Sequence, residues 1–512
     1  MEDSVMKRLS GLTVVAVLVT AVCFLWLTSG AAQAQSKCGN TAAPAKPTRI
    51  KGGESFGPLP LPATPLRRTE RKRQPSPPAL VGKLEYGKLV WATDAEGKKY
   101  SYLDWTTDPQ DIANLLIWTN AQLGIKYKPI TAKFNAFSYD PAEIPILYLT
   151  GHEGFELSDE YRKNLRWFLQ DGGYLIGDTC CGSKPFAESF IKEMAIIFPD
   201  RPLKPLSLDH PLFNCFYQIN QVQYRDGDKP TEKKAPLVYG VNIGCRTAVM
   251  FVPYDVSCGW DGHPGPGGFG LMQNDARQLG ANMITYSLAN YQLGRFLSTE
   301  KVYFEKDEKT RDEFVFGQVM HGGDWDPDPG AVANLLKYVG ANSTMEIQFK
   351  RANVDLKKAD AFMYPFLYLT GHEDFKWTDQ EVALLRNYLS NGGVLLSDAC
   401  CGRDTFDQAF RREMKRVLPQ AKLEPLPAAH PLYTAKAQIR NVSYTDMVKQ
   451  AKPDLNTPEL EGITLSGALA VIYSKYDLGC GWEEQIHPYS KGVASGDSLK
   501  LGMNTLVYAM TH

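Results

Sequence analysis

Two adjacent cysteine pairs are the residues of this chain best suited to chemistry. Cys180-Cys181 and Cys400-Cys401 each lie in the pattern Asp-x-Cys-Cys-Gly. A thiolate is both a nucleophile and a metal ligand, and a thiol near a helix N-terminus ionises more easily. Neighbouring thiols can also form a strained, redox-labile disulfide or simply pack as small apolar side chains. Nucleophilic catalysis, metal binding, redox change and packing are therefore all open interpretations.

A histidine stands at the same position before each cysteine pair. The phrase Leu-Tyr-Leu-Thr-Gly-His-Glu occurs twice and supplies His152 and His372. A nucleophilic cysteine needs a histidine within hydrogen-bond reach and a third group that orients it. The histidines could equally anchor a loop, and the aspartates before the cysteines could cap a helix. The catalytic candidates are Cys180, Cys400, His152, His372, Asp178 and Asp398.

Other repeated residues could line a binding site. His210 and His430 each precede a proline, which favours a turn. Trp260 and Trp482, in the repeated Cys-Gly-Trp phrase, could line a sugar pocket or pack in the core. The binding candidates are Glu153, Glu373, Cys181, Cys401, His210, His430, Trp260 and Trp482. A zinc site could draw on Cys180, Cys181, His152 and His210, but two adjacent thiolates rarely serve one tetrahedral ion easily. We therefore expect no metal and no cofactor.

These phrases belong to a duplicated domain. The same interval of 220 residues separates His152 from His372, and Cys180 from Cys400. So long a period with two copies indicates paired globular domains rather than a solenoid. In the second copy, apolar runs predict strands over residues 313–320, 364–370 and 394–397. A capping-box pattern followed by helical spacing predicts a helix over 379–389, and helical spacing predicts another over 406–418. Ligands of such α/β sheets bind beyond the carboxyl ends of the strands, where both repeated phrases lie.

The order of these motifs resembles a known family. Strand, Gly-His, helix, Gly-Gly, strand, Asp-x-Cys-Cys-Gly, helix and Asp-His-Pro-Leu-Phe at residues 209–213 look like the domain-of-unknown-function family 4159 over most of both copies. The first copy departs from it at Tyr102-Leu103, where the second has Gly322-Gly323. That family is similar to the class I glutamine amidotransferase-like fold and to trehalose-utilisation-like proteins. The resemblance implies two tandem three-layer α/β domains, each a mostly parallel sheet with helices on both faces, flavodoxin-like or class I glutamine amidotransferase-like.

The resemblance also implies a position for a nucleophile. In amidotransferases the corresponding turn carries a cysteine followed two residues later by glycine, and Cys180 and Cys400 fall on that position. The amidotransferase pattern then places a histidine late in the domain, followed soon by an acid. His263 and His487 lie late in each copy, but neither stands in a His-x-Glu phrase. The enzyme interpretation therefore lacks a base of the expected pattern.

The N-terminal region differs in character from the repeats. Lys7-Arg8 precede an apolar run over residues 12–27 and an Ala-x-Ala pattern, which predicts a signal peptide, with an uncleaved anchor as the alternative. A start at Met6 would give a cleaner leader than one at Met1. We expect residues 1–34 as signal peptide or membrane anchor, 35–84 as a Pro-rich basic disordered linker, and 85–297 and 298–512 as the two repeats.

We predict an exported protein, periplasmic or secreted, or anchored by an uncleaved N-terminal helix. The formal net charge of −1 gives no basic face for nucleic acid. The predicted role is binding of a small molecule, a glycan or an envelope protein, with a membrane contact through the N-terminal segment as a further option and the repeats packed as a pseudo-dimer. The alternatives are a thiol-dependent hydrolase or amidotransferase-like enzyme, and redox sensing by the cysteine pairs. Whether the protein is an enzyme stays open.

Overall fold

The computed structural model describes residues 80–93, 96–263, 268–291, 312–343, 347–358, 360–484 and 487–512. The predicted leader and almost all of the predicted linker lie outside these ranges. Within them, no helix combines the length and the apolar character that crossing a membrane requires.

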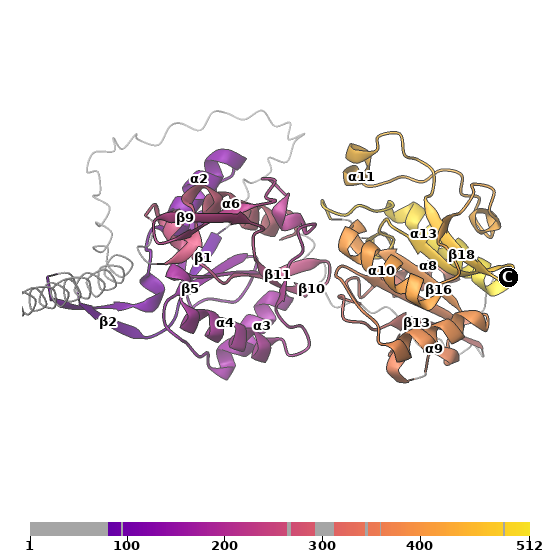
Figure 1. The fold of residues 1–512 in the computed structure, drawn as a ribbon, viewed down its shortest axis with the longest axis horizontal. Helices are drawn as coiled ribbons and strands as arrows, with labels where there is room; N and C mark the ends of the chain where they lie inside the picture. Colours follow the sequence, from indigo (N-terminus) through magenta and orange to yellow (C-terminus); the bar gives the residue numbers. More distant parts are fainter. Residues whose placement is uncertain are drawn as a thin grey trace, which may run out of the picture.

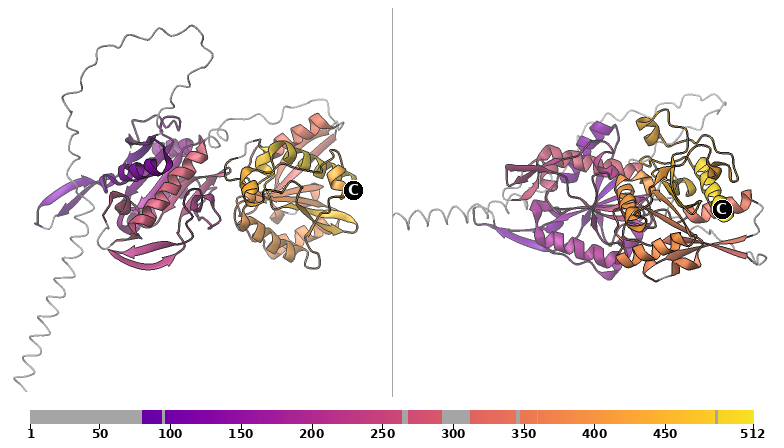
Figure 2. Two further views of the ribbon diagram at one scale, coloured as in Figure 1. Left: turned by 90° about the horizontal axis from the view of Figure 1, so that it is seen from above. Right: turned by 45° about the vertical axis from the view of Figure 1, so that its right-hand side comes forward.

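The two repeats form two α/β domains that lie side by side (Figures 1 and 2). Each contains a mixed seven-stranded sheet that is mostly parallel, in the order β4-β1-β5-β6-β11-β10-β7 in the first domain and β14-β13-β15-β16-β19-β18-β17 in the second. Only the last two strands of each order run antiparallel to their neighbours. The predicted fold class, two tandem α/β domains with mostly parallel sheets, is confirmed.

The elements of the first domain follow the repeat in chain order. Its strands are β1 (Leu80–Glu85), β2 (Leu89–Thr93), β3 (Lys99–Leu103), β4 (Lys128–Lys133), β5 (Ile146–Gly151), β6 (Tyr174–Thr179), β7 (Lys204–Pro205), β8 (Val222–Asp226), β9 (Lys229–Lys234), β10 (Tyr239–Ile243), β11 (Arg246–Val252) and β12 (Phe269–Leu271). Its α-helices are α2 (Asp111–Leu123), α3 (Asp159–Gln170), α4 (Lys184–Ile197), α5 (Ser257–Asp261) and α6 (Gln273–Ala289). The β2-β3 hairpin and the small β12-β8-β9 sheet were not predicted from the sequence.

The second domain repeats the same plan. Its strands are β13 (Asp312–Val319), β14 (Ile347–Val354), β15 (Phe366–Gly371), β16 (Val394–Ala399), β17 (Glu424–Pro425), β18 (Leu460–Leu465) and β19 (Ala468–Ser474). Its α-helices are α8 (Ala331–Asn342), α9 (Asp379–Ser390), α10 (Asp404–Val417), α11 (Asp446–Ala451), α12 (Gly479–Trp482) and α13 (Ser495–Thr511). The five predicted strands and helices correspond to β13, β15, β16, α9 and α10, and the capping box predicted for α9 is present at Thr378 and Glu381.

Alternation along each central strand builds the two halves of the core. On β15, Phe366 and Tyr368 pack with the side chains of α8 and α13, whereas Leu367 and Leu369 pack with those of α9 and α10. All six residues of this strand are buried, as expected for a parallel strand covered on both faces. Because β15, β16 and β19 are parallel neighbours in this sheet, their carboxyl ends meet at one edge.

The two domains contact each other through different faces. The first domain contributes the edge that carries β7 and the β10-β11 turn, and β10 lies on its side nearest the second domain (Figure 1). The second contributes the carboxyl ends of its strands. Lys204 Nζ lies 3.0 Å from Glu373 Oε2, and Arg403 Nη2 donates to Asp209 Oδ1 at 3.2 Å. The arrangement is therefore head-to-tail, with the site edge of one repeat covered by the other repeat.

Candidate metal centre

The Asp-x-Cys-Cys-Gly phrase forms a tight turn that points two sulfurs to one place. Cys400–Gly402 is a single 3₁₀ turn at the end of β16, and Cys401 adopts φ 55° and ψ 12°. This left-handed conformation is unusual for a residue with a side chain. Gly402, at φ 61°, lies where a Cβ would come within 2.6 Å of the Lys491 carbonyl oxygen. The turn leaves Cys400 Sγ and Cys401 Sγ 3.7 Å apart.

The same turn occurs in the first domain. Cys181 has φ 55° and ψ 14°, and its sulfur lies 3.7 Å from that of Cys180. The agreement between the copies shows that the backbone strain belongs to the motif. Two adjacent cysteines can therefore face a common point here, because the second one takes the left-handed conformation.

A third sulfur reaches each turn from the short helix that follows the next strand. Cys480 lies on α12 after β19, and its Sγ is 4.0 Å from Cys401 Sγ. Cys258 lies on α5 after β11, 3.9 Å from Cys180 Sγ and 3.8 Å from Cys181 Sγ. Neither residue was among the sequence candidates. Their signal was available, because both stand in the repeated Cys-Gly-Trp phrase.

The predicted catalytic aspartates hold these short helices in place. Asp398 Oδ2 accepts hydrogen bonds from the backbone N–H groups of Leu478 at 2.7 Å and Gly479 at 3.1 Å, and Tyr368 Oη donates to Oδ1 at 2.7 Å. Asp178 makes the equivalent contacts in the first domain, where burial raises its pKa to about 6. The hydrogen bonds of both carboxyl groups go to backbone and tyrosine, so the geometry favours the helix-cap interpretation for both.

We expect Asp398→Ala to destabilise the second domain strongly. The substitution leaves two backbone donors and one tyrosine hydroxyl buried without an acceptor, so the free energy of unfolding should fall by about 3 kcal/mol or more. Urea denaturation followed by fluorescence measures this. Asp379→Ala, in which an exposed carboxylate on α9 is removed, is the control and should change the stability by less than about 1 kcal/mol. A small effect at Asp398 would contradict the bracing role.

A fourth sulfur comes from the other domain. Cys245 lies in the turn between β10 and β11 of the first domain, and its Sγ is 3.3 Å from Cys400 Sγ and 3.5 Å from Cys480 Sγ. The four sulfurs of Cys245, Cys400, Cys401 and Cys480 are buried and all lie within 4.8 Å of one another. Cys245 has no counterpart 220 residues later, where Leu465 stands, and nothing in the sequence connects it with the second repeat.

The sulfur spacing is that of ligands to one ion. Zinc–sulfur bonds of about 2.3 Å in a tetrahedron place the sulfurs about 3.8 Å apart. Four of the sulfur–sulfur distances among Cys245, Cys400, Cys401 and Cys480 are 3.3, 3.5, 3.7 and 4.0 Å. An iron–sulfur cluster would distribute its thiolates over several iron atoms, which needs a wider set. The arrangement therefore fits a single tetrahedral, thiophilic cation.

Polar groups surround the four sulfurs. Cys245 Sγ donates to Asp328 Oδ1 at 2.9 Å, and Cys400 Sγ donates to Asp328 Oδ2 at 3.3 Å. His487 Nε2 and His372 Nε2 lie 2.9 and 3.2 Å from Cys401 Sγ, and His372 Nδ1 lies 2.7 Å from Asp324 Oδ2. The expected meeting of the thiols with the histidine of the neighbouring strand therefore occurs.

These contacts give the Cys401 thiol a different pKa shift from that of the neighbouring Cys400 thiol. Burial alone raises the pKa of the Cys401 thiol, but hydrogen bonds from the three other thiols and the charge of His487 outweigh it and hold the pKa well below its usual value. Burial, together with the neighbouring thiols, raises the pKa of Cys400 well above its usual value. The protein groups alone therefore favour ionisation of Cys401 over that of Cys400.

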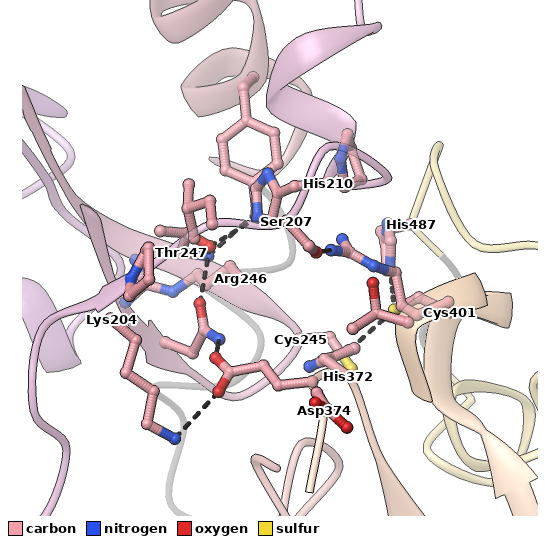
Figure 3. Close-up of a pocket in the computed structure, with 18 of the residues that line it drawn as sticks. Lys204, Ser207, His210, Cys245, Arg246, Thr247, His372, Asp374, Cys401 and His487 are labelled. Atoms are coloured by element: carbon pink, nitrogen blue, oxygen red, sulfur yellow. Dashed lines mark hydrogen bonds and ion pairs between the residues drawn. The ribbon is translucent and has the colours of Figure 1, made fainter. Parts of the chain in front are cut away.

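A cavity of about 510 Å³ lies between the domains beside this centre. Figure 3 shows the side chains of Lys204, His210, Cys245, Arg246, His372 and Cys401 around it. His210 belongs to the first domain, yet it faces the centre of the second. Its Nε2 lies 2.8 Å from Thr247 Oγ1 and its Nδ1 accepts from the Leu212 N–H, so local hydrogen bonds hold it as a turn residue.

The remaining sequence candidates lie apart from the sulfurs. Trp260 and Trp482 are buried in the core, where they donate to the backbone carbonyls of Ala276 and Ser498. His430 lines a different cavity. Glu373 joins the domain interface through Lys204 and Asn242, and the Glu153 backbone N–H donates to Asp104.

The first domain gathers a related but different set. The sulfurs of Cys180 and Cys181 lie with a ring nitrogen of His152 inside 4.8 Å. Asp108, at the position of Asp328, accepts from Cys180 Sγ at 3.1 Å, and His263 Nε2 lies 3.1 Å from Asp108 Oδ1. No cysteine from another domain joins this set among the residues that the structure describes.

Comparison with protein families matches both repeats. A family described as Domain of unknown function (DUF4159) covers residues 98–288 and 315–510. No curated protein matches the chain.

Proposed function

The chain belongs to the DUF4159 family as two tandem copies, and we propose that it binds a thiophilic metal ion that joins the two repeats. The observation that carries this proposal is the buried cluster of the Cys245, Cys400, Cys401 and Cys480 sulfurs, all within 4.8 Å of one another. Three of these sulfurs belong to the second domain and one to the first. An ion bound there closes the head-to-tail contact as a clasp.

Zinc is the ion that this ligand set fits best. Four thiolates in a tetrahedron are a structural zinc site, and soft ligands also suit copper(I). Four thiolates around a divalent cation carry two net negative charges. His372 and His487 both contact Cys401 Sγ, so their ring N–H groups offset part of that charge. Before they ionise, the thiols of Cys245 and Cys400 donate to Asp328, which positions both sulfurs.

The closed ligand set favours a structural role for the ion itself. A site with four protein ligands leaves no open position for substrate. Ligand binding then falls to the cavity beside the centre, which both domains line. The binding of a small molecule, a glycan or an envelope protein, and the exported location, remain parts of this proposal.

Metal analysis of the full chain tests the proposal. Protein purified under reducing conditions should retain zinc through dialysis, and Cys480→Ser should lose the ion held between the domains. Cys215→Ser is the matched control, because Cys215 contacts the backbone carbonyls of Leu212 and Asn282 and lies outside the cluster. Equal metal content in Cys480→Ser and wild type would contradict the proposal.

A thiol nucleophile is the second candidate function. Cys401 stands on a strained left-handed turn and contacts His372, which contacts Asp324, at 3.2 and 2.7 Å. This is the order of groups in a cysteine–histidine–acid triad. It falls on the second cysteine of the pair in the second domain, whereas the likeness to amidotransferases, itself still a proposal, pointed to the first. Redox sensing has weaker support, in the 3.3 Å separation of Cys245 and Cys400.

Alkylation distinguishes the metal site from the nucleophile. If Cys401 acts as a nucleophile in the absence of metal, iodoacetamide should label it rapidly in protein prepared without zinc. The labelling should be equally fast after zinc is added. If it is a metal ligand, zinc should protect it and a chelator should restore labelling. Mass spectrometry of the peptide that contains Cys400 and Cys401 gives the rate.

A further inference from the structure

Three sulfurs of the first domain form one face of a second tetrahedron. The distances are 3.7 Å between Cys180 and Cys181, 3.9 Å between Cys180 and Cys258, and 3.8 Å between Cys181 and Cys258. All three agree with the edge of about 3.8 Å that a tetrahedral zinc–thiolate site requires. The two domains therefore share a three-thiolate core and differ in what completes it.

Sulfur completes the core only in the second domain. There the fourth ligand position is occupied by Cys245 at the second position of the β10-β11 turn. The equivalent β18-β19 turn pairs Leu465 with Ala468 just as the first pairs Ile243 with Arg246, and it carries Gly467 in place of Cys245. A second copy of this chain could therefore not supply a cysteine to the first domain through that turn. Among the described residues, the candidate for the fourth ligand is therefore of another residue type.

His152 lies beside two of the three sulfurs and is the histidine that we assign to this position. A ring nitrogen of His152 lies within 4.8 Å of both Cys180 Sγ and Cys181 Sγ. The hydroxyl of Thr107 donates to the Asp104 backbone carbonyl oxygen at 2.7 Å, so its oxygen accepts from His152 Nδ1–H at 3.3 Å. A hydrogen bond of this kind fixes the tautomer in which Nε2 carries the lone pair. Nε2 is the nitrogen that can then bind a cation.

The corresponding histidine of the second domain is held differently. His372 Nδ1 lies 2.7 Å from Asp324 Oδ2, and its Nε2 lies 3.2 Å from Cys401 Sγ. In the first domain the matching Asp104 instead accepts the backbone N–H groups of His152 and Glu153 at 3.0 Å. Asp104 Oδ1 also lies 3.9 Å from His152 Nδ1, farther than the Thr107 hydroxyl at 3.3 Å. Both partners lie on the Nδ1 side of the ring, which leaves Nε2 as the nitrogen for a cation.

Asp108 supports the sulfurs from outside the ligand set. Its Oδ2 accepts from Cys180 and Cys258 at 3.1 and 3.3 Å, as Asp328 does for two sulfurs of the other domain. Its Oδ1 lies 3.1 Å from His263 Nε2. The carboxylate therefore has partners on both oxygens and positions the thiol groups of Cys180 and Cys258.

We propose that the first repeat holds a second thiophilic ion through Cys180, Cys181, Cys258 and His152. This inference rests on the proposed metal-binding function and assigns the repeat a three-sulfur, one-nitrogen site. Cys181 and His152 are partly exposed, whereas the four cysteines of the other centre are buried. The ion of the first repeat should therefore exchange faster with solvent chelators.

Cobalt(II) titration of the full chain under reducing conditions tests this second site. Wild type should take up two equivalents, and Cys258→Ser and Cys480→Ser one each. The ion left in Cys480→Ser should show the absorption of a three-sulfur, one-nitrogen site and should leave first when a chelator is added. Cys181→Ser repeats the test at a partly exposed position, so that misfolding of Cys258→Ser does not decide the result.

His152 is tested in the Cys480→Ser background. His152→Ala should weaken the remaining cobalt site by on the order of 100-fold or more, and His152→Cys should restore binding with a four-sulfur spectrum. An unchanged affinity in His152→Ala would overturn the assignment of the fourth ligand. One equivalent in wild type and none in Cys480→Ser would overturn the second site while leaving the clasp intact. No uptake by wild type would overturn the clasp itself.

Discussion

Cys245→Ser should remove most of the affinity of the second domain for its ion. The variant loses one of four thiolates, and it loses the only ligand that the first domain provides among the described residues. Changes to residues that merely orient a ligand already cost about 10–100-fold in affinity, so removal of the ligand itself should cost on the order of 100-fold or more. Competition with a chromophoric zinc chelator measures the dissociation constant.

The matched control for this prediction is again Cys215→Ser, which changes a first-domain cysteine outside the cluster. The measurement is best made in the Cys258→Ser background, where the first repeat cannot contribute a three-thiolate site. An affinity in Cys245→Ser equal to that of its parent would show that the first domain does not ligate the ion.

Removal of the ion should destabilise the second domain and loosen the domain contact. A ligand present at about 1,000 times its dissociation constant stabilises the folded state by about 4 kcal/mol. For a domain of this size that corresponds to a fall of roughly 10 °C in Tm on chelation. Differential scanning calorimetry with and without chelator tests the shift, and small-angle scattering tests whether the domains separate.

The polar contacts between the domains set the limit of that separation. Asp209 with Arg403 and Thr405, and Lys204 with Glu373, do not depend on the ion. We therefore expect partial opening rather than full release of the domains. An unchanged Tm and an unchanged scattering profile after complete metal removal would contradict the clasp. Complete removal means that the chelator has taken both ions from the wild-type protein, and not only one of the two.

Much of the fold could be predicted because buried parallel strands leave a clear local pattern in the sequence. The buried run of β15 and the capping box of α9 depend on local pattern alone, and both occur as expected. The meeting of His372 with the cysteine turn followed from the rule that the carboxyl ends of parallel strands share an edge. These inferences need no knowledge of how the domains pack.

The metal centre could not be predicted in the same way. The objection that adjacent cysteines rarely serve one ion assumed ordinary backbone geometry, and the left-handed conformation of Cys401 removes it. Cys480 depends on a helix of four residues that Asp398 positions. Cys245 depends on the packing of one repeat against the other, which no local pattern encodes.

X-ray absorption at the zinc edge tests the central claim most directly. In the Cys258→Ser variant, where the ion between the domains is the one expected to remain, the spectrum should show four sulfur neighbours at about 2.3 Å. A first shell dominated by nitrogen or oxygen at about 2.0–2.1 Å, or a protein without bound metal, would contradict the four-cysteine clasp.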